Sequence, residues 1–121
     1  MIASPLRHGR GTWTPTITAG TGSITTSTSS NQHYEVHGRI CHFRVTIGIT
    51  TNGTGATSVN FTLPIQAAQT MVAIGRETAL TGKAITATCA GGSSTAAAFY
   101  YDLTYPGGNG ANLEISGAYF V

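Results

Sequence analysis

The sequence predicts an all-β protein, an antiparallel β-sandwich of jelly-roll type built from about eight short strands. Three observations support this prediction. Apolar and polar residues alternate over several stretches, turn residues such as Asn-Gly and Gly-Gly separate these stretches, and no stretch has the period and caps of a helix. Alternation implies one buried and one exposed face for each strand, which favours antiparallel pairing.

The clearest strand is expected within residues 38–50, in the middle of the chain. Its odd positions are apolar from Cys41 to Ile49, whereas its even positions are polar or small and include His42 and Arg44. Because side chains point to alternate faces of a strand, the odd set should face the core. In a helix, apolar residues at every second position would surround the cylinder instead of forming one face.

Further strands are expected on both sides of the central one. Residues 12–19 alternate around Trp13 and contain Pro15, which has no amide hydrogen, so an edge strand is predicted there. Residues 20–31 are rich in Thr, Ser and Gly and are expected to form a loop and a weak outer strand. The remaining strands are expected at 32–36, 58–63, 69–76, 84–90, 95–103 and 113–121.

The core should consist of the inward residues of these strands. The set expected to be buried contains Phe43, Val45, Ile47, Phe61, Ile85, Phe99 and Ile115. In residues 95–103, Phe99, Tyr101 and Leu103 are expected to face inward, with Tyr100 and Asp102 on the other face.

The two cysteines, Cys41 and Cys89, also fall on inward positions. We expect two buried free thiols, because free Cys is among the most buried residue types and no secretion signal is seen. The sequence leaves a disulfide between them open, since pairing depends on geometry.

Length and composition predict a single domain with a sparsely charged surface. The chain has 121 residues, 8% of them charged, and a formal net charge of +2. This charge, without a run of Lys or Arg, argues against a nucleic-acid partner, and no apolar run is long enough for insertion into a membrane. We expect a flexible lead-in or linker at residues 1–10, without the apolar segment of a secretion signal, and a single domain at 11–121.

The low charge also bears on association. Exposed strand edges are usually protected by charged residues or Pro, and this chain has few of either. We therefore expect the sheet edges to be covered in an oligomer.

Catalytic and metal-binding patterns are not found in the sequence. The acidic residues Glu35, Glu77, Asp102 and Glu114 lack a pairing typical of glycosidases and are interpreted as surface carboxylates. The His residues have no metal-binding spacing; three copies of His42 would meet only in a threefold assembly, and an isolated surface His is the ordinary interpretation. Phosphate-loop and dinucleotide motifs are also absent. We expect a non-enzymatic protein without cofactor or metal.

A ligand site is expected in and beside the loop at residues 105–112. Tyr rings offer apolar faces, Asn amides both donate and accept, and a carboxylate accepts hydroxyl hydrogen bonds, which together suit a sugar. The candidate ligand-binding residues are Tyr100, Asp102, Tyr105, Asn109 and Asn112. Loops at 51–57 and 90–94 are alternatives, and a hairpin tip that binds nothing is a further one.

Four short motifs in this chain resemble the C-terminal domains of bacteriophage tail fibre and tail spike proteins. They are Gly-Thr-Trp-Thr-Pro at 11–15, Tyr34 followed by Gly38-Arg39, Leu63-Pro64, and Ile-Ser-Gly-Ala-Tyr at 115–119. Their order and spacing extend the resemblance over residues 11–121.

The resemblance implies a trimeric β-sandwich at the far end of a fibre, made in the bacterial host cytoplasm and built into the virion. Such a homotrimer would bind a host polysaccharide or protein receptor without catalysis and would contact other tail or virion proteins. The resemblance assigns no binding residue. A carbohydrate-binding module of a secreted protein and a purely structural virion or tail protein remain as alternatives.

Overall fold

The structure is a computed structural model that describes residues 8–121. Within this range, no helix is long and apolar enough to cross a membrane. The described chain forms nine strands: β1 (His8–Thr12), β2 (Ile17–Thr21), β3 (Thr26–His37), β4 (Ile40–Thr51), β5 (Ala56–Thr62), β6 (Met71–Glu77), β7 (Ala84–Cys89), β8 (Thr95–Tyr100) and β9 (Ala111–Phe120).

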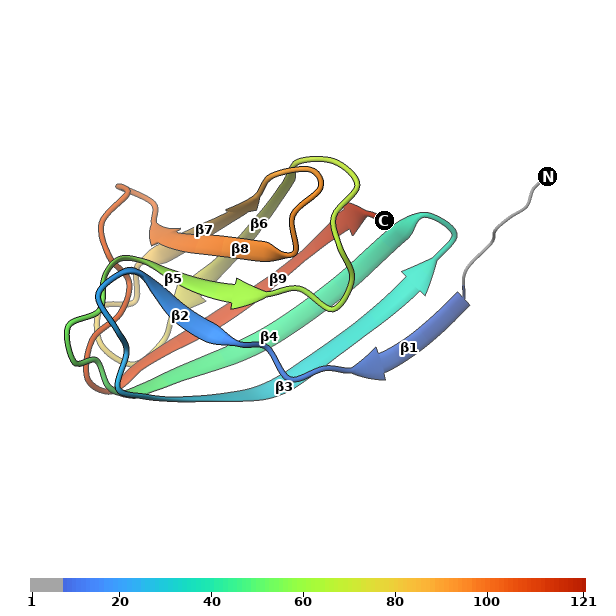
Figure 1. Ribbon diagram of the computed structural model, residues 1–121. Coiled ribbons are helices and arrows are strands. Elements are labelled where there is room, and N and C mark those ends of the chain that lie inside the picture. The colour runs from blue at the N-terminus through green and yellow to red at the C-terminus, as the bar shows by residue number, and fades with distance from the viewer. Residues whose placement is uncertain (1–7) are drawn as a thin grey trace.

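These strands join one antiparallel sheet in the order β1-β3-β4-β9-β6-β7-β8-β5-β2. The sheet curls so that β2, β5 and β8 face β3, β4 and β9 (Figure 1). Phe43 of β4 and Phe61 of β5 accordingly meet across the core, with ring centroids 6.2 Å apart. The all-β antiparallel prediction is confirmed. The two facing halves stay continuous through β6 and β7, so the shape is a half-barrel rather than a two-sheet jelly roll.

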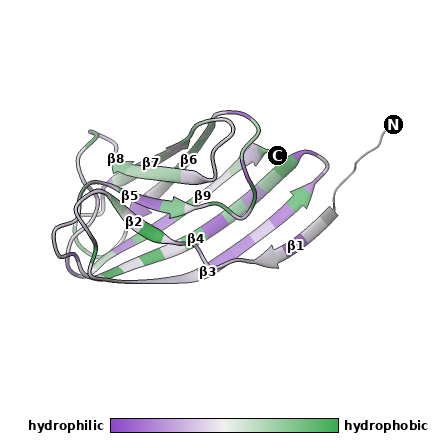
Figure 2. Cartoon of the chain, in the orientation of Figure 1, coloured by the Kyte–Doolittle hydropathy of each residue, from purple (hydrophilic) through white to green (hydrophobic). Residues whose placement is uncertain are grey.

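The central strand has the predicted faces. Along β4, the alternate residues from Cys41 to Ile49 are at most 4% exposed, whereas His42 and Arg44 lie on the exposed outer face. Hydrophobic and hydrophilic residues alternate along the strands in Figure 2. The other predicted core residues that are buried are Val45, Ile47, Phe61, Ile85 and Ile115. Cys41 and Cys89 are buried free thiols.

The strand predicted at 12–19 is interrupted in its middle. Its first part belongs to β1, which pairs with β3, and its last part belongs to β2, which pairs with β5 at the opposite edge of the sheet. The buried Pro15 lies at the corner between them and cannot donate to a ladder. Beside it, Trp13 Nε1 donates to the Thr62 carbonyl at 2.8 Å. Both strands are edge strands, as predicted, because the chain passes from one edge to the other.

Two strand boundaries differ from the prediction. β1 takes in residues 8–10 of the expected lead-in, because their backbone pairs with the C-terminal half of β3; residues 1–7 lie outside the described residues. β3 runs from Thr26 to His37, so the weak outer strand expected within 20–31 and the strand expected at 32–36 form one continuous strand. Pairing with the long edge of β4 satisfies its backbone groups, although its side chains are mostly small and polar.

β8 faces the opposite way to the prediction. Ala96, Ala98 and Tyr100 are buried, and Phe99 lies half-exposed on the outer face, so its expected place in the core was wrong. The reason lies in the neighbouring strand, where Phe61 pairs with Ala96 and Val59 with Ala98. Large residues of β5 already fill this part of the core, and only small neighbours fit beside them without overpacking.

Candidate functional site

The predicted ligand residues lie around the β8–β9 connection, at the left end of the half-barrel in Figure 1. The β4–β5 and β6–β7 connections meet it there, because Tyr105 bonds to Asn52, and Asn112 bonds to Thr78. The structure therefore brings the predicted loop at 105–112 and the alternative loop at 51–57 together.

Tyr100 is not available to a ligand at this end of the molecule. It is 6% exposed, and its hydroxyl forms a 2.8 Å hydrogen bond with Thr81 Oγ1. Its expected outward position was wrong because β8 turns this face toward the core. Tyr100 instead ties β8 to the β6–β7 turn.

Tyr105 and Asn109 brace two loops against each other. The Tyr105 hydroxyl donates to Asn52 Oδ1 at 2.5 Å, and Asn109 Oδ1 accepts the Asn52 amide hydrogen at 2.8 Å. Asn52 Nδ2 in turn donates to the Gly55 carbonyl at 2.9 Å. Burial of the half-buried Tyr105 ring raises the pKa of its hydroxyl. These polar groups already have partners within the chain, which indicates a structural role.

Asn112 is engaged in the same way. Its Nδ2 donates to Thr78 Oγ1 at 2.7 Å and to Glu114 Oε2 at 3.1 Å. Its backbone amide donates to Glu77 Oε2 at 3.0 Å. Asn112 therefore joins the start of β9 to the end of β6.

Glu77 is fully buried, with 0% exposure, which corrects its interpretation as a surface carboxylate. Its carboxylate accepts backbone hydrogen bonds from Ala79, Leu80, Thr81 and Asn112 at 2.6–3.0 Å. Burial by itself would raise its pKa, but these donors outweigh burial and lower the pKa to about 2. The carboxylate thus organises the β6–β7 turn as an acceptor for otherwise unpaired amides.

The groups that remain exposed here form a small tip, which we define as Lys83, Tyr101, Asp102 and Leu103. Tyr101 is 63% exposed and Leu103 is 73% exposed, contrary to their expected inward positions. Leu103 also has φ of 67°, in the left-handed region that a Leu side chain disfavours. The backbone amides of Leu103 and Tyr100 donate to the carbonyls of Tyr100 and Thr104, which close a tight turn.

The charged groups of the tip are fixed by contacts within the chain. Asp102 Oδ1 accepts hydrogen bonds from the Thr104 hydroxyl at 2.5 Å and from its amide at 3.3 Å. Asp102 Oδ2 lies 3.6 Å from Lys83 Nζ. The Thr104 hydroxyl, ahead of the Lys83 charge, lowers the pKa of Asp102. Lys83 Nζ also lies 5.2 Å from the centroid of the buried Tyr100 ring. The tip thus combines an exposed Tyr101 ring with a paired carboxylate and ammonium group.

The sequence analysis assigned Asp102 to the site but missed Tyr101 and Leu103. The signal that could have located them is the Asp102-x-Thr104 spacing, since Asp side chains favour turns by bonding to the backbone two residues on. Such a turn ends the strand at Tyr100 and exposes the residues that follow it.

The described residues contain no group of three or more His, Cys, Asp or Glu side chains placed to hold a metal ion. A scan against models of known protein families gives no match, and searches of curated proteins and of solved structures give none either.

Proposed function

We propose that the protein is a non-catalytic receptor-binding domain from the end of a phage tail fibre, which binds a host surface glycan as a homotrimer. The tip carries this proposal. The Leu103 side chain is exposed and its backbone is in a disfavoured conformation, and strain of this kind collects at ligand-binding sites. Tyr101 offers a ring face for stacking on a sugar, and Asp102 and Lys83 suit its hydroxyl groups.

The motifs that resemble tail fibre domains support the proposal in a different way, because their residues build the framework. Trp13, from the first motif, bonds to Thr62, which precedes Leu63-Pro64. The hydroxyl of Tyr119, from the last motif, donates to the Ile65 carbonyl at 2.8 Å and accepts from the Ile65 amide at 3.2 Å. Residues of these three motifs therefore meet at the end of β5 and in the segment that follows it. A shared framework with separate binding loops suits a family of receptor-binding domains.

A substitution at the tip tests this proposal. The Tyr101→Ala variant should keep its melting temperature, because the ring is exposed, but should bind a glycan selected on an array about tenfold more weakly, as one lost aromatic contact of about 1.4 kcal/mol implies. Titration calorimetry with that glycan and adsorption to host cells provide the measurements. Leu80→Ala, which removes an exposed apolar side chain of the neighbouring turn, is the matched control and should bind normally.

The outcomes separate the rival functions. Unchanged binding by a folded Tyr101→Ala protein would contradict a role for the tip. An array without any bound glycan, together with firm incorporation into virions, would favour a purely structural protein. If the gene that encodes this domain also encodes a secreted enzyme, the result would favour a carbohydrate-binding module.

A further inference from the structure

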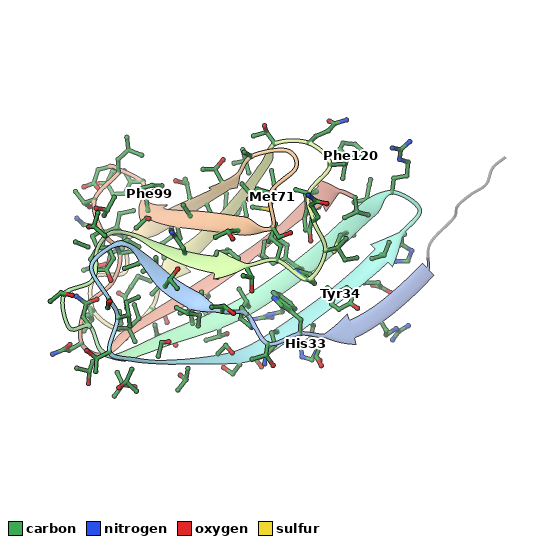
Figure 3. All side chains as sticks on the ribbon, viewed as in Figure 1. His33, Tyr34, Met71, Phe99 and Phe120 are labelled. Atoms are coloured by element: carbon green, nitrogen blue, oxygen red, sulfur yellow. The ribbon has the colours of Figure 1, made fainter. Side chains whose placement is uncertain are left out.

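A groove of about 590 Å³ is lined by residues of β1, β3 and β4 on the outer face of the sheet. β1 lies at the opposite end of the half-barrel from the β8–β9 connection (Figure 1). The residues that line it with outward side chains are Arg10, Thr12, His33, Glu35, His42 and Arg44. Between them lie Gly11, Tyr34 and Phe43, and the rings of Tyr34 and Phe43 pack toward the core. His33 and Tyr34 accordingly lie on opposite sides of β3 (Figure 3).

Strand register arranges the outward side chains in two rows. Arg10, Glu35 and His42 are cross-strand partners in one row, and Thr12, His33 and Arg44 are partners in the other. Each row spans two strand spacings, roughly 10 Å. Arg10 and Arg44 therefore start from diagonal corners of the groove, and Glu35 lies on the middle strand in the row of Arg10.

The charges of the groove favour an anion. Within residues 8–121, Arg10 makes no ion pair or side-chain hydrogen bond, so its guanidinium is available to a ligand. Arg44 Nη2 lies 3.4 Å from Glu114 Oε1, which orients the guanidinium while its side chain stays 57% exposed. Glu35 is the one carboxylate that lines the groove in the described chain, and its Oε2 lies 3.3 Å from His37 Nε2.

We propose that this groove binds an acidic saccharide of the uronate type, in which each charged sugar carries one carboxylate. A guanidinium fork matches a carboxylate with two parallel hydrogen bonds, and Arg10 or Arg44 can provide one. Glu35 has no hydrogen to donate when ionised, so it suits sugar hydroxyls as an acceptor. The same carboxylate would repel a doubly charged phosphate group more strongly than the singly charged carboxylate of one sugar ring. The volume is within the range of about 300–1,000 Å³ for small-ligand sites.

The proposal concerns residues other than the tip and does not depend on it. Digalacturonate is a suitable probe, with the neutral disaccharide galactobiose and inorganic phosphate as comparisons, each titrated into the full chain by calorimetry. Digalacturonate should bind at least tenfold more tightly than galactobiose, and its affinity should fall as salt is raised, because the exposed guanidinium groups are screened.

Arg10→Ala is the better test variant, because Arg44→Ala would remove the contact with Glu114 as well as any contact with the ligand. It should weaken digalacturonate binding at least tenfold at an unchanged melting temperature. Arg10→Lys should recover only part of the loss, because an ammonium group keeps the charge without the planar fork. Tyr101→Ala, at the tip, should bind digalacturonate as well as the unaltered protein does.

Three results would overturn the proposal. They are no measurable binding of digalacturonate, equal affinity for galactobiose, and phosphate binding as tight as that of the sugar acid, which would indicate a simple oxyanion site. Loss of binding in Tyr101→Ala but not in Arg10→Ala would place the acidic sugar at the tip and likewise contradict a site in this groove.

Discussion

Glu77 stabilises the end of the molecule where the β6–β7 turn meets the start of β9. A buried carboxylate is unfavourable unless donors surround it, and here four backbone amides supply that environment. Glu77→Gln should lower the free energy of unfolding by about 3 kcal/mol, because the amide nitrogen of Gln cannot accept hydrogen bonds from the amides that face it. Urea unfolding at neutral pH measures the loss. Glu35→Gln, at a half-exposed carboxylate, is the control and should change stability by less than about 0.5 kcal/mol.

The same carboxylate predicts a pH dependence. The pKa of Glu77 is about 2 in the folded protein, below its ordinary value of 4.5, so the folded state favours the ionised form. Its contribution is complete above about pH 4.5 and is lost as the pH falls through the folded pKa, so stability decreases toward acid. The unaltered protein should therefore lose about 3 kcal/mol more than Glu77→Gln between about pH 5 and pH 2. Parallel pH profiles for the two proteins would contradict this assignment.

At the scale of elements, β4 and β8 show how neighbours decide which face of a strand is buried. Phe43 lies in the core against Trp13, Phe61 and Tyr119, whereas Phe99 lies on the outer face of β8. Phe43→Ala should cost about 3–5 kcal/mol of unfolding free energy because it leaves a cavity. Phe99→Ala should cost less than about 1 kcal/mol, because solvent fills the space. Denaturant unfolding of the two variants side by side tests the assignment, and equal losses would contradict it.

At the scale of the whole molecule, an apolar strip remains on the outer face. Val72 and Ile74 of β6 are exposed, as are Phe120 of β9 and its cross-strand partner Ile40. The curled sheet also leaves β1 and β2 as its edges. Few charges are available to keep such surfaces apart, and association would cover them.

The proposed homotrimer, which rests on the low charge and on the resemblance to tail fibre domains, predicts that light scattering at micromolar concentration gives three times the chain mass of 12.5 kDa. A closed ring of three requires the same contact between successive copies, and the apolar strip is the surface we assign to it. Ile74→Glu should shift the mass toward that of a monomer, because a buried carboxylate in the contact would be unpaired. Leu80→Glu, at an exposed site outside the strip, should remain a trimer. A stable monomer of the unaltered protein would contradict this prediction.

The sequence by itself determined the strands and most of their faces. Alternation is a local property of a strand, so the buried and exposed residues of β4 and β7 could be assigned from the chain alone. Pro15 likewise placed its segment at an edge because it has no amide hydrogen to share. Asp102 was also assigned to the candidate site from the sequence, because it precedes the loop at 105–112 and its carboxylate can accept hydroxyl hydrogen bonds.

Only the tertiary structure decided the features that depend on partners distant in sequence. The space beside Phe61 determined that Ala96 and Ala98, and not Phe99, face inward on β8. The same reversal buried Tyr100 and exposed Tyr101. The tertiary structure also brought amides of the β6–β7 connection and of β9 around Glu77, and it placed Arg10 and Arg44 in adjacent cross-strand rows on either side of β3. These features arise from packing and register between distant segments, which no local pattern contains.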